Sequence, residues 1–285
     1  MARDLCLVYA NCQGEALAPL LEASPEFAAR FEIRHYLNYA RSEEALEAAG
    51  RCQLLLHQYL APKWGEYSTA QVLPLIPESA ASIVIPNFFF KGYWPFWTSD
   101  FEGIEFADSL LESLIAKGLP YDAILNLYLR MSSALMGDVE AVVRDSIARE
   151  RKKEEAGPIK YVGYLEENWR KHQLFLTINH PGKELLLLAA NGILALLGFR
   201  PLPESALENY QHPQGDFWLP IHPLVGAKLK LPFAGADRKY GCFGAKLTHR
   251  EYISRYLACR EHGLADLTGV LKALAEDGAA SSGEH

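Results

Sequence analysis

The chain is short of positive charge. Its 285 residues include 28 lysines and arginines against 35 aspartates and glutamates, a formal net charge of −7. Nucleic-acid-binding proteins gather an excess of lysine and arginine, so this balance argues against nucleic acid as the main ligand, although a local basic pocket is compatible with it. The apolar share of 49% and the charged share of 22% are those of an ordinary soluble globular protein.

Long apolar runs and patterned cysteines are also missing. The longest apolar stretch, residues 185–199, is interrupted by Asn191 and Gly192 and is shorter than the ~20 residues that span a bilayer. The five cysteines show neither a disulfide framework nor a zinc-ligand spacing, so we expect no metal site. Because the N-terminus runs directly into a strand, we expect no signal peptide, a cytoplasmic location and reduced thiols.

The first turn of the chain lacks several familiar motifs. After the apolar run at residues 5–10 comes Asn11-Cys12-Gln13-Gly14, in which the single glycine excludes a glycine-rich nucleotide fingerprint. Glu15 stands three residues after Cys12, so there is no Cys-x-x-Cys pair. The following turn has no arginine to close a phosphatase-type loop. An isolated thiol remains.

That thiol lies between a strand and a helix. The Leu- and Val-rich run at residues 5–10 predicts a strand buried on both faces, and the spacing of Leu17, Leu20 and Leu21 predicts a helix directly after the turn. Ligands bind at this edge of parallel sheets, and a helix N-terminus lowers the pKa of a thiol. A small buried cysteine is the alternative, but the polar neighbours of Cys12 favour a solvent-facing thiol.

Strands and helices alternate through the first third of the chain. We predict strands at residues 31–37, 52–58 and 82–85, with helices at 42–50 and 66–76 between them. This order predicts an α/β protein with a mainly parallel sheet flanked by helices. Further helices are predicted at 108–118, 121–156 with a bend at Gly137, 161–172, from Glu184, and at 248–261. We therefore predict one α/β domain over residues 1–275 with a helix-rich C-terminal half, and a disordered tail at 276–285.

Polar residues end three of the predicted strands. They are Asn11-Cys12-Gln13, His57-Gln58 and Asn87. Carboxyl ends of parallel strands share one edge, so their coincidence predicts a site there. The tract that follows, residues 88–97, holds seven aromatic residues and Lys91, which we consider as a phosphate contact. The tract either caps the core or forms the wall of a pocket for a sugar or an adenine ring.

A second candidate lies far along the chain. His180 follows a short apolar extension, in the sequence Asn179-His180-Pro181, and precedes a helix. This is the position of a base that partners a nucleophile from the first strand, while a histidine that caps the following helix is the alternative.

These segments together resemble the WcbI-type family of acetyltransferases of capsular polysaccharide biosynthesis. The resemblance extends from the first strand to about residue 230 and is carried by Asn11-Cys12-Gln13-Gly14, Ile85-Pro86-Asn87, Leu174-Phe175, Asn179-His180-Pro181 and Leu219-Pro220-Ile221-His222-Pro223. It implies a fold similar to the SGNH/GDSL hydrolases and coenzyme A or acetyl-CoA as the bound cofactor. Cys12 then replaces the nucleophilic serine and His180 takes the place of the catalytic histidine. Thr177 stands where that pattern has an acid, so the third member of a triad is missing or comes from elsewhere.

The resemblance implies acyl transfer from acetyl-CoA to a sugar or polysaccharide hydroxyl, with Cys12 as nucleophile and His180 as base. A nearby imidazolium and the helix N-terminus would favour the thiolate. The oxyanion and the substrate would be positioned by Asn11, Gln13, Gln58, Asn87 and Asn179. The phosphates of coenzyme A need local cations and other polar contacts, for which the candidates are Lys91, His57, His222, Lys228, Lys230, Arg238 and Lys239.

Three other outcomes stay open. His180 activates the sugar hydroxyl for direct attack on acetyl-CoA without an acyl-enzyme. Water as acceptor makes the protein an esterase or thioesterase. A non-catalytic protein that binds coenzyme A or a glycan would keep the fold and lack the catalytic activity. The sequence contains no motif specific to one acceptor sugar or to one oligomeric state.

Overall fold

The computed structural model describes residues 2–281, which divide into two compact units. The first unit runs through Phe89 and includes residues 147–169 and 179–214. The second unit comprises residues 90–146, 170–178 and those from Gly215 onward. The sequence predicted one domain over residues 1–275. Whether these two units fold as one domain is not tested by their division, and the single domain stays a prediction.

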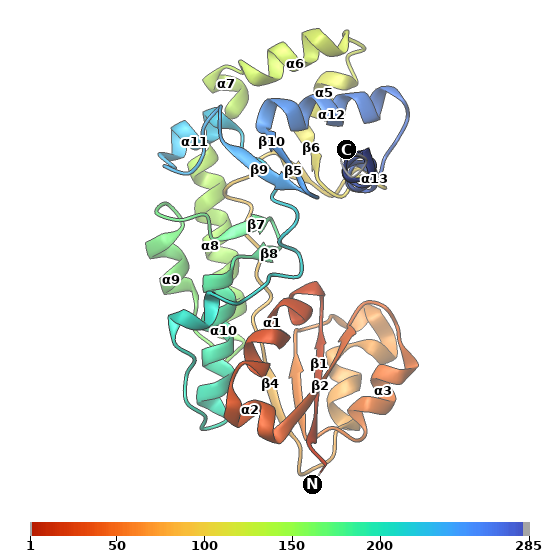
Figure 1. Cartoon of the computed structure of the whole chain (residues 1–285), viewed down its shortest axis with the longest axis vertical. Helices are drawn as coiled ribbons and strands as arrows, with labels where there is room; N and C mark the ends of the chain where they lie inside the picture. The colour runs from red at the N-terminus through yellow and green to blue at the C-terminus, as the bar shows by residue number, and fades with distance from the viewer. Residues whose placement is uncertain (1, 282–285) are drawn as a thin grey trace. The chain divides into compact units, whose positions relative to one another are not determined.

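The first unit contains the parallel sheet. Its strands are β1 (Asp4–Ala10), β2 (Phe31–Leu37), β3 (Leu54–His57) and β4 (Ala81–Val84). They lie in the order β2-β1-β3-β4, and every neighbouring pair is parallel (Figure 1). Strand β1 lies between β2 and β3, and its residues from Cys6 to Ala10 are buried, which explains why this strand is an apolar run in the sequence. The α/β class and the parallel sheet predicted from the sequence are confirmed.

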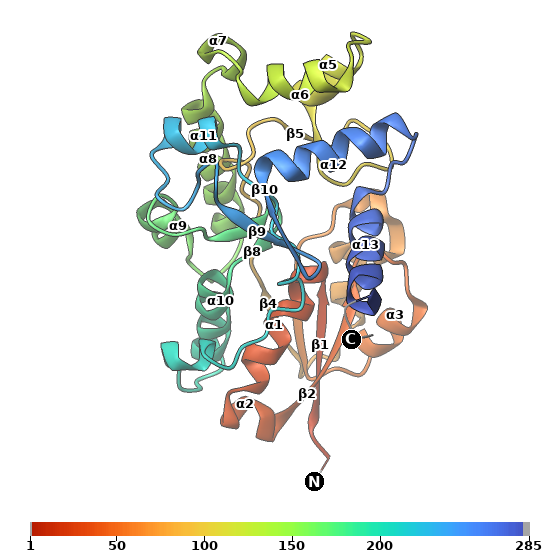
Figure 2. The same ribbon diagram turned by 45° about the horizontal axis from the view of Figure 1, so that its top comes forward.

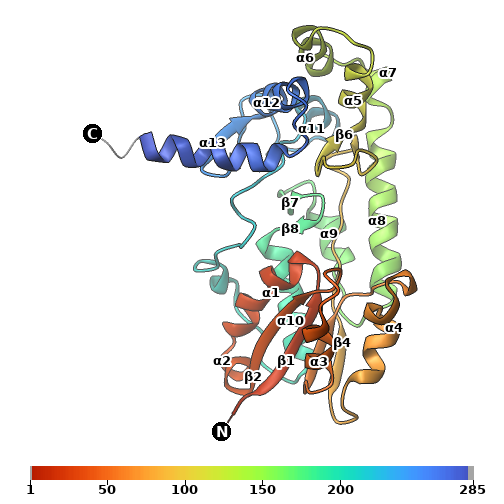
Figure 3. The ribbon, with the colours of Figure 1, turned by 90° about the vertical axis from the view of Figure 1, so that its right-hand side faces the viewer.

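Helices cover both faces of this sheet (Figures 1 and 3). Helix α3 (Glu43–Ala49) packs on one face, where its alanines join Leu7, Tyr9 and Leu55 in a buried cluster. Ser42 caps α3 by accepting a hydrogen bond from the Ala45 N–H, and Gly50 ends it, as the sequence predicted. The helices on the other face are α1 (Cys12–Glu22), α2 (Pro25–Arg30) and α10 (Lys183–Leu196).

The remaining elements of the first unit are short. They are η1 (Pro62–Tyr67), α4 (Thr69–Val72), η2 (Leu73–Leu75), α9 (Val162–Asn168), β8 (His180–Pro181) and η3 (Glu204–Leu207). The single helix predicted at 66–76 is therefore wrong. Ser68 has an extended backbone with φ −66° and ψ 153°, and Pro74 lacks a backbone N–H, so one continuous helix cannot form across this segment.

The second unit is built from helices and short strand pairs (Figure 2). Its strands are β5 (Trp97–Thr98), β6 (Ala107–Asp108), β7 (Phe175–Thr177), β9 (Lys239–Cys242) and β10 (Ala245–Thr248). Its helices are α5 (Ser109–Ile115), α6 (Tyr121–Leu129), α7 (Ser133–Met136), α11 (Pro223–Leu229), α12 (His249–Glu261) and α13 (Leu267–Ser281). Thr248 and Glu251 form a capping box that starts α12 where the sequence predicted a helix.

Two sequence predictions need correction here. The long helix predicted over 121–156 is three helices, of which the last is α8 (Val139–Glu155), because Gly137 takes a positive φ of 65° and ends α7. Residues 276–281 belong to helix α13 rather than to a disordered tail, and residues 282–285 lie outside the described part. Within residues 2–281, none of the helices combines the length and the apolar character needed to cross a bilayer.

Candidate active site

The turn after β1 places a thiol at the start of a helix. Cys12 is the first residue of α1, and the Asn11 side chain caps that helix by accepting a hydrogen bond from the Gln13 N–H at 2.9 Å. Gly14 is required for close packing, since a Cβ there would lie 2.7 Å from the His35 ring and 2.9 Å from a Val8 methyl group. Local capping and packing against β1 and β2 therefore fix the direction of the Cys12 side chain.

Cys12 lies against the imidazole of His180. The Sγ–Nε2 distance is 3.3 Å, although the two residues are 168 positions apart in the sequence. Both side chains are half-buried. The predicted approach of thiol and imidazole is thus present within one compact unit, in the geometry that a nucleophile and its base require.

The environment of His180 keeps its imidazole neutral. Burial, with the neighbouring His212 as the smaller cause, lowers the pKa of His180 to about 4. At neutral pH the ring is therefore an available proton acceptor, and the imidazolium expected beside the thiol is not favoured. Neither cause is a carboxylate, so an acid for the third member of a triad stays unassigned.

His212 was not among the candidates predicted from the sequence. Its Nε2 donates a hydrogen bond to the Pro181 carbonyl at 2.9 Å, and its Nδ1 accepts one from the Gln214 N–H at 3.1 Å. The Gln214 side chain in turn donates to the Cys12 carbonyl at 3.4 Å. The loop at residues 212–214 therefore borders the Cys–His pair. Its only sequence signal is a second His-Pro dipeptide, which resembles an ordinary turn.

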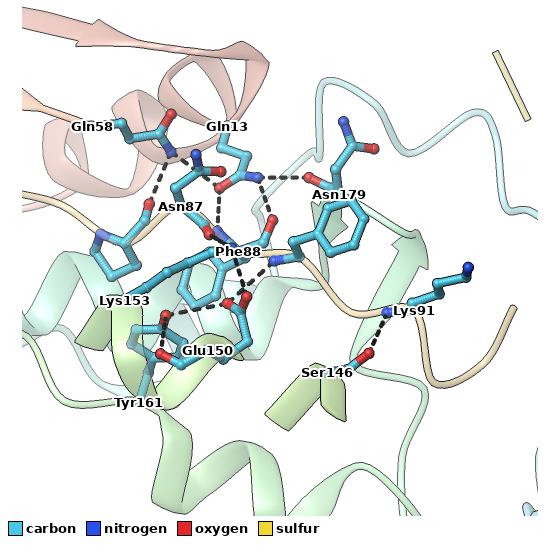
Figure 4. A network of polar contacts seen from close by, with 12 residues as sticks. Gln13, Gln58, Asn87, Phe88, Lys91, Ser146, Glu150, Lys153, Tyr161 and Asn179 are labelled. Atoms are coloured by element: carbon cyan, nitrogen blue, oxygen red, sulfur yellow. Dashed lines mark hydrogen bonds and ion pairs between the residues drawn. The ribbon is translucent and has the colours of Figure 1, made fainter. Parts of the chain in front are cut away.

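Gln13 connects the site's separate segments (Figure 4). Its Nε2 donates to the Phe88 carbonyl at 2.8 Å and to the Asn179 carbonyl at 2.7 Å. Its Oε1 accepts from the Phe88 N–H at 3.0 Å and from Gln58 Nε2 at 3.2 Å. The side chain is only 3% exposed. These contacts make Gln13 a positioning residue rather than a substrate contact, because each of its polar atoms is already hydrogen-bonded.

The three polar strand ends meet as the sequence predicted. Gln58, fully buried, accepts a hydrogen bond from the Asn11 N–H at 2.9 Å and donates one to the Pro86 carbonyl at 2.9 Å. Asn87 Oδ1 accepts one from Asn11 Nδ2 at 3.4 Å. Gln58 thus ties strand ends together and does not face a substrate, which corrects its predicted role. Asn11 and Asn87 are half-buried, and the main-chain carbonyl of Asn179 accepts a hydrogen bond from Gln13.

A buried carboxylate holds the segment after β4 (Figure 4). Glu150 accepts hydrogen bonds from the Phe89 N–H at 3.3 Å and from the Tyr161 hydroxyl at 3.2 Å. It also pairs with Lys153 at 2.6 Å, and Lys153 donates to the Asn87 carbonyl at 2.8 Å. Burial raises the pKa of Glu150 and the Lys153 ammonium opposes that shift. Beside this network lies a cavity of about 210 Å³ with largely apolar walls, lined by Tyr59, Val84, Ile85, Pro86, Asn87, Lys153, Glu154, Ala156, Gly157, Ile159 and Tyr161.

The predicted cofactor contacts are dispersed. His57 belongs to the first unit but is only 4% exposed, and burial lowers its pKa. His222 caps α11, and its ring nitrogens bond the Tyr128 carbonyl and the Leu224 N–H, so it is engaged in the fold. The other cationic candidates also belong to the second unit, namely Lys91, Lys228, Lys230, Arg238 and Lys239. In that unit the Lys91 N–H bonds Ser146 (Figure 4).

Cys12 should be the cysteine that reacts first with an alkylating reagent. It is half-buried, whereas Cys6, Cys52, Cys242 and Cys259 are buried and burial raises the pKa of each of these four. Treating the native protein with iodoacetamide should therefore label Cys12 well before the other four, as read by peptide mass spectrometry. Equal labelling of Cys12 and Cys52 in folded protein would contradict this reading, and urea-unfolded protein is the control in which all five react.

The fold and the site define an α/β protein with a cysteine–histidine pair at the carboxyl edge of its parallel sheet. Residues 5–202 match the family model of the polysaccharide biosynthesis enzyme WcbI. The chain belongs to the WcbI family of polysaccharide biosynthesis enzymes, which confirms the resemblance seen in its sequence.

A solved structure supports the same fold. It is a WcbI described as a polysaccharide biosynthesis enzyme, in a native form without a disulfide bond between coenzyme A and a cysteine. The two proteins are 18% identical, with a TM-score of 0.74 over 96% of this chain and 95% of the other. A search of curated proteins found no match.

Proposed function

We propose that the protein is an acyltransferase that moves an acetyl group from acetyl-CoA to a hydroxyl of a saccharide. The observation that carries this proposal is the 3.3 Å approach of Cys12 Sγ and His180 Nε2 at a helix start. Membership of a polysaccharide biosynthesis family supports a saccharide acceptor. The description of the similar WcbI structure, which names a disulfide between coenzyme A and a cysteine, supports a thiol cofactor beside Cys12.

In the first step Cys12 is the nucleophile. His180, neutral because of its low pKa, accepts the thiol proton as the sulfur attacks the thioester carbonyl. The bond between the acetyl carbon and the coenzyme A sulfur breaks, and His180 returns the proton to that leaving sulfur. The acetyl group is then carried by Cys12 as a new thioester.

In the second step His180 is the base for the acceptor. It removes the proton of the saccharide hydroxyl while the hydroxyl oxygen attacks the Cys12 thioester. The carbon–sulfur bond breaks, Cys12 takes the proton back, and an O-acetyl ester leaves. With water in place of the saccharide the same site would hydrolyse acetyl-CoA, so the ratio of the two products measures acceptor specificity.

Both steps pass through a tetrahedral oxyanion beside the start of α1. The N-terminus of this helix carries a partial positive charge, which stabilises negative charge at the Cys12 carbonyl adduct. The Asn87 side chain lies on the same edge, with its Oδ1 turned to Asn11, so its amide N–H groups are candidates for the second donor. The fold similarity to SGNH/GDSL hydrolases belongs to this proposal.

The first unit also has features that fit a coenzyme A donor. The half-buried Cys12 thiol is accessible to a second thiol, and the cavity of about 210 Å³ adjoins Asn87. Its apolar walls suit the aliphatic part of the donor, and Lys153 on its lining is a cation for a phosphate. A role in capsule synthesis and a cytoplasmic location remain parts of the proposal.

Coenzyme A disulfide should label Cys12 and no buried cysteine. The Cys12 thiolate attacks one sulfur of the reagent, the S–S bond breaks, one coenzyme A leaves as thiol, and the protein gains one coenzyme A in mass. Dithiothreitol should reverse the adduct, and Cys12→Ser should form none, while Cys52→Ala serves as the matched control that still forms it. A protein that gains no mass, or gains it equally after Cys12→Ser, would speak against coenzyme A as the cofactor of this site.

A further inference from the structure

The second unit contains a cavity walled by aromatic side chains. It measures about 40 Å³ and is lined by Tyr93, Trp94, Pro95, Phe96, Trp97, Phe106, Ala107, Asp108, Tyr128, Leu219, Pro220, His222, His249, Tyr252, Ile253 and Tyr256. Part of this lining is residues 93–97 of the aromatic tract. Another part is one face of α12, whose His249, Tyr252, Ile253 and Tyr256 recur at helical spacing. Helix α12 also contacts α6 and β10 (Figure 2).

Most polar groups around this cavity serve the fold. The Tyr128 hydroxyl donates to Asp108, whose other oxygen caps α5. The Trp94 indole N–H donates to the Leu219 carbonyl at 3.1 Å, and the Trp97 indole N–H donates to the Glu105 carbonyl at 3.2 Å. These hydrogen bonds hold the side chains in place, so Tyr128, Trp94 and Trp97 have few donors or acceptors left for a ligand.

Two buried groups on α12 are exceptions. His249 Nδ1 and the Tyr252 hydroxyl have no hydrogen-bond partner among the described residues, although the side chains are only 2% and 3% exposed. A buried polar atom without a partner is destabilising, so such groups are rare unless water or a ligand satisfies them. Both residues line the same cavity from the same helix face. The cavity therefore offers one acceptor or donor and one hydroxyl to whatever enters it.

The lining also selects against charged ligands. None of the described residues that line the cavity is lysine or arginine, while Asp108 contributes a carboxyl group. An anion such as a nucleotide phosphate would find no partner here, and an apolar ligand would leave the two polar groups unsatisfied. A neutral ligand with both apolar faces and hydroxyl groups satisfies both conditions, and a sugar ring has this chemistry.

From this combination we propose that the second unit binds a neutral saccharide, with aromatic side chains against the ring and one substituent inside the cavity. A volume of about 40 Å³ has room for about three water-sized groups, which is the size of a hydroxymethyl or acetamido substituent and not of a whole ring. Pro95, Phe96 and Trp97 are half-buried, so the ring would rest on exposed parts of this tract. Only the identification of this saccharide as the acetyl acceptor rests on the proposed function.

Binding can be measured without any acyl donor. The probes are methyl glucoside and N-acetylglucosamine as neutral sugars and glucuronic acid as an anionic one, followed by tryptophan fluorescence and saturation-transfer NMR on the full chain. At least one neutral sugar should bind in the millimolar range and glucuronic acid should bind more weakly. Absence of binding by both neutral sugars would overturn the proposal.

Three variants locate the site. Tyr252→Phe removes one hydroxyl and should weaken neutral-sugar binding by about 3- to 10-fold, the worth of one hydrogen bond. Phe96→Ala removes a ring from the tract and should weaken it by about tenfold. Tyr240→Phe is the matched control, because Tyr240 is equally buried at 1% exposure but does not line the cavity. Sugar binding that is unchanged by Tyr252→Phe and Phe96→Ala, or that falls equally with Tyr240→Phe, would place the sugar elsewhere and overturn the proposal.

The outcome is separable from that of the proposed function. Cys12→Ala should bind the neutral sugar as tightly as the wild type. If the sugar binds but Cys12 forms no adduct with coenzyme A disulfide, the acyltransferase proposal fails and the saccharide site stands. If the adduct forms and no neutral sugar binds, the saccharide site fails alone.

Discussion

Replacing Cys12 with alanine should reduce acetyl transfer by about a thousandfold or more, because the covalent route loses its nucleophile. The measurements are release of free coenzyme A from acetyl-CoA, with and without saccharides, and the intact mass of the protein during turnover. Wild-type protein should gain one acetyl group, and peptide mapping should place it on Cys12. The variant should show neither the gain nor the release.

The control for this experiment is Cys52→Ala, since Cys52 is fully buried and far from reagents in solution. It should retain wild-type turnover and the acetyl adduct. Near-normal turnover of Cys12→Ala would instead show that His180 activates the acceptor hydroxyl for direct attack on acetyl-CoA. In that event the acetyl-enzyme is no intermediate, while the assignment of His180 as base stays intact.

Replacing His180 with alanine should lower turnover by about 10²- to 10⁴-fold, the usual contribution of a general base. The pH profile provides an independent check. Because the pKa of His180 is lowered to about 4, the ring is neutral above that pH and protonated below it. The acid limb of kcat/KM should therefore fall near pH 4 and not near 6.5, where an unperturbed histidine titrates.

His212→Asn tests the cause of that shift. The variant removes the smaller of the two causes that lower the His180 pKa, so the acid limb should move upward but stay below 6.5, since burial remains. A wild-type limb already near 6.5, unchanged in His212→Asn, would contradict the neutral-base description. It would instead favour the imidazolium–thiolate pair expected from the sequence.

The sequence predicted best the features that local patterns encode. The apolar run before Asn11 gave β1, the alternation at 31–37 gave β2 with exact bounds, and Ser42 with Gly50 gave the limits of α3. The alternating order of strands and helices predicted a parallel sheet. Because the carboxyl ends of parallel strands share one edge, this order also predicted that the three polar strand ends meet. The sequence around His180 allowed either a partner for Cys12 or a helix cap, and only the family resemblance favoured the pairing, because no local pattern relates residues so far apart.

Other features left no local pattern. The hairpin of β9 and β10 was missed because its two turn residues are Phe243 and Gly244, both with positive φ, where asparagine–glycine is the usual signal. The role of Gln13 was misjudged because three of its four hydrogen bonds are with main-chain groups of residues 88 and 179, which carry no sequence signature. His212 was missed for the same reason, since its own contacts are also with the backbone.

Gln13 has a consequence for how this site tolerates substitution. Its bonds to residues 88 and 179 reach only the peptide groups, which every amino acid supplies except for the missing N–H of proline. These hydrogen bonds therefore make no demand on the side chains at 88 and 179, although Phe88 is restricted by its own packing, since it is 2% exposed and its ring centroid lies 4.9 Å from that of Tyr161. Substitution is costly at 13 itself, where glutamate would lose both amide donors and leucine all four hydrogen bonds. A comparison of related chains should therefore find glutamine retained at position 13, because no other side chain supplies both the donors and the acceptor that hold these two segments.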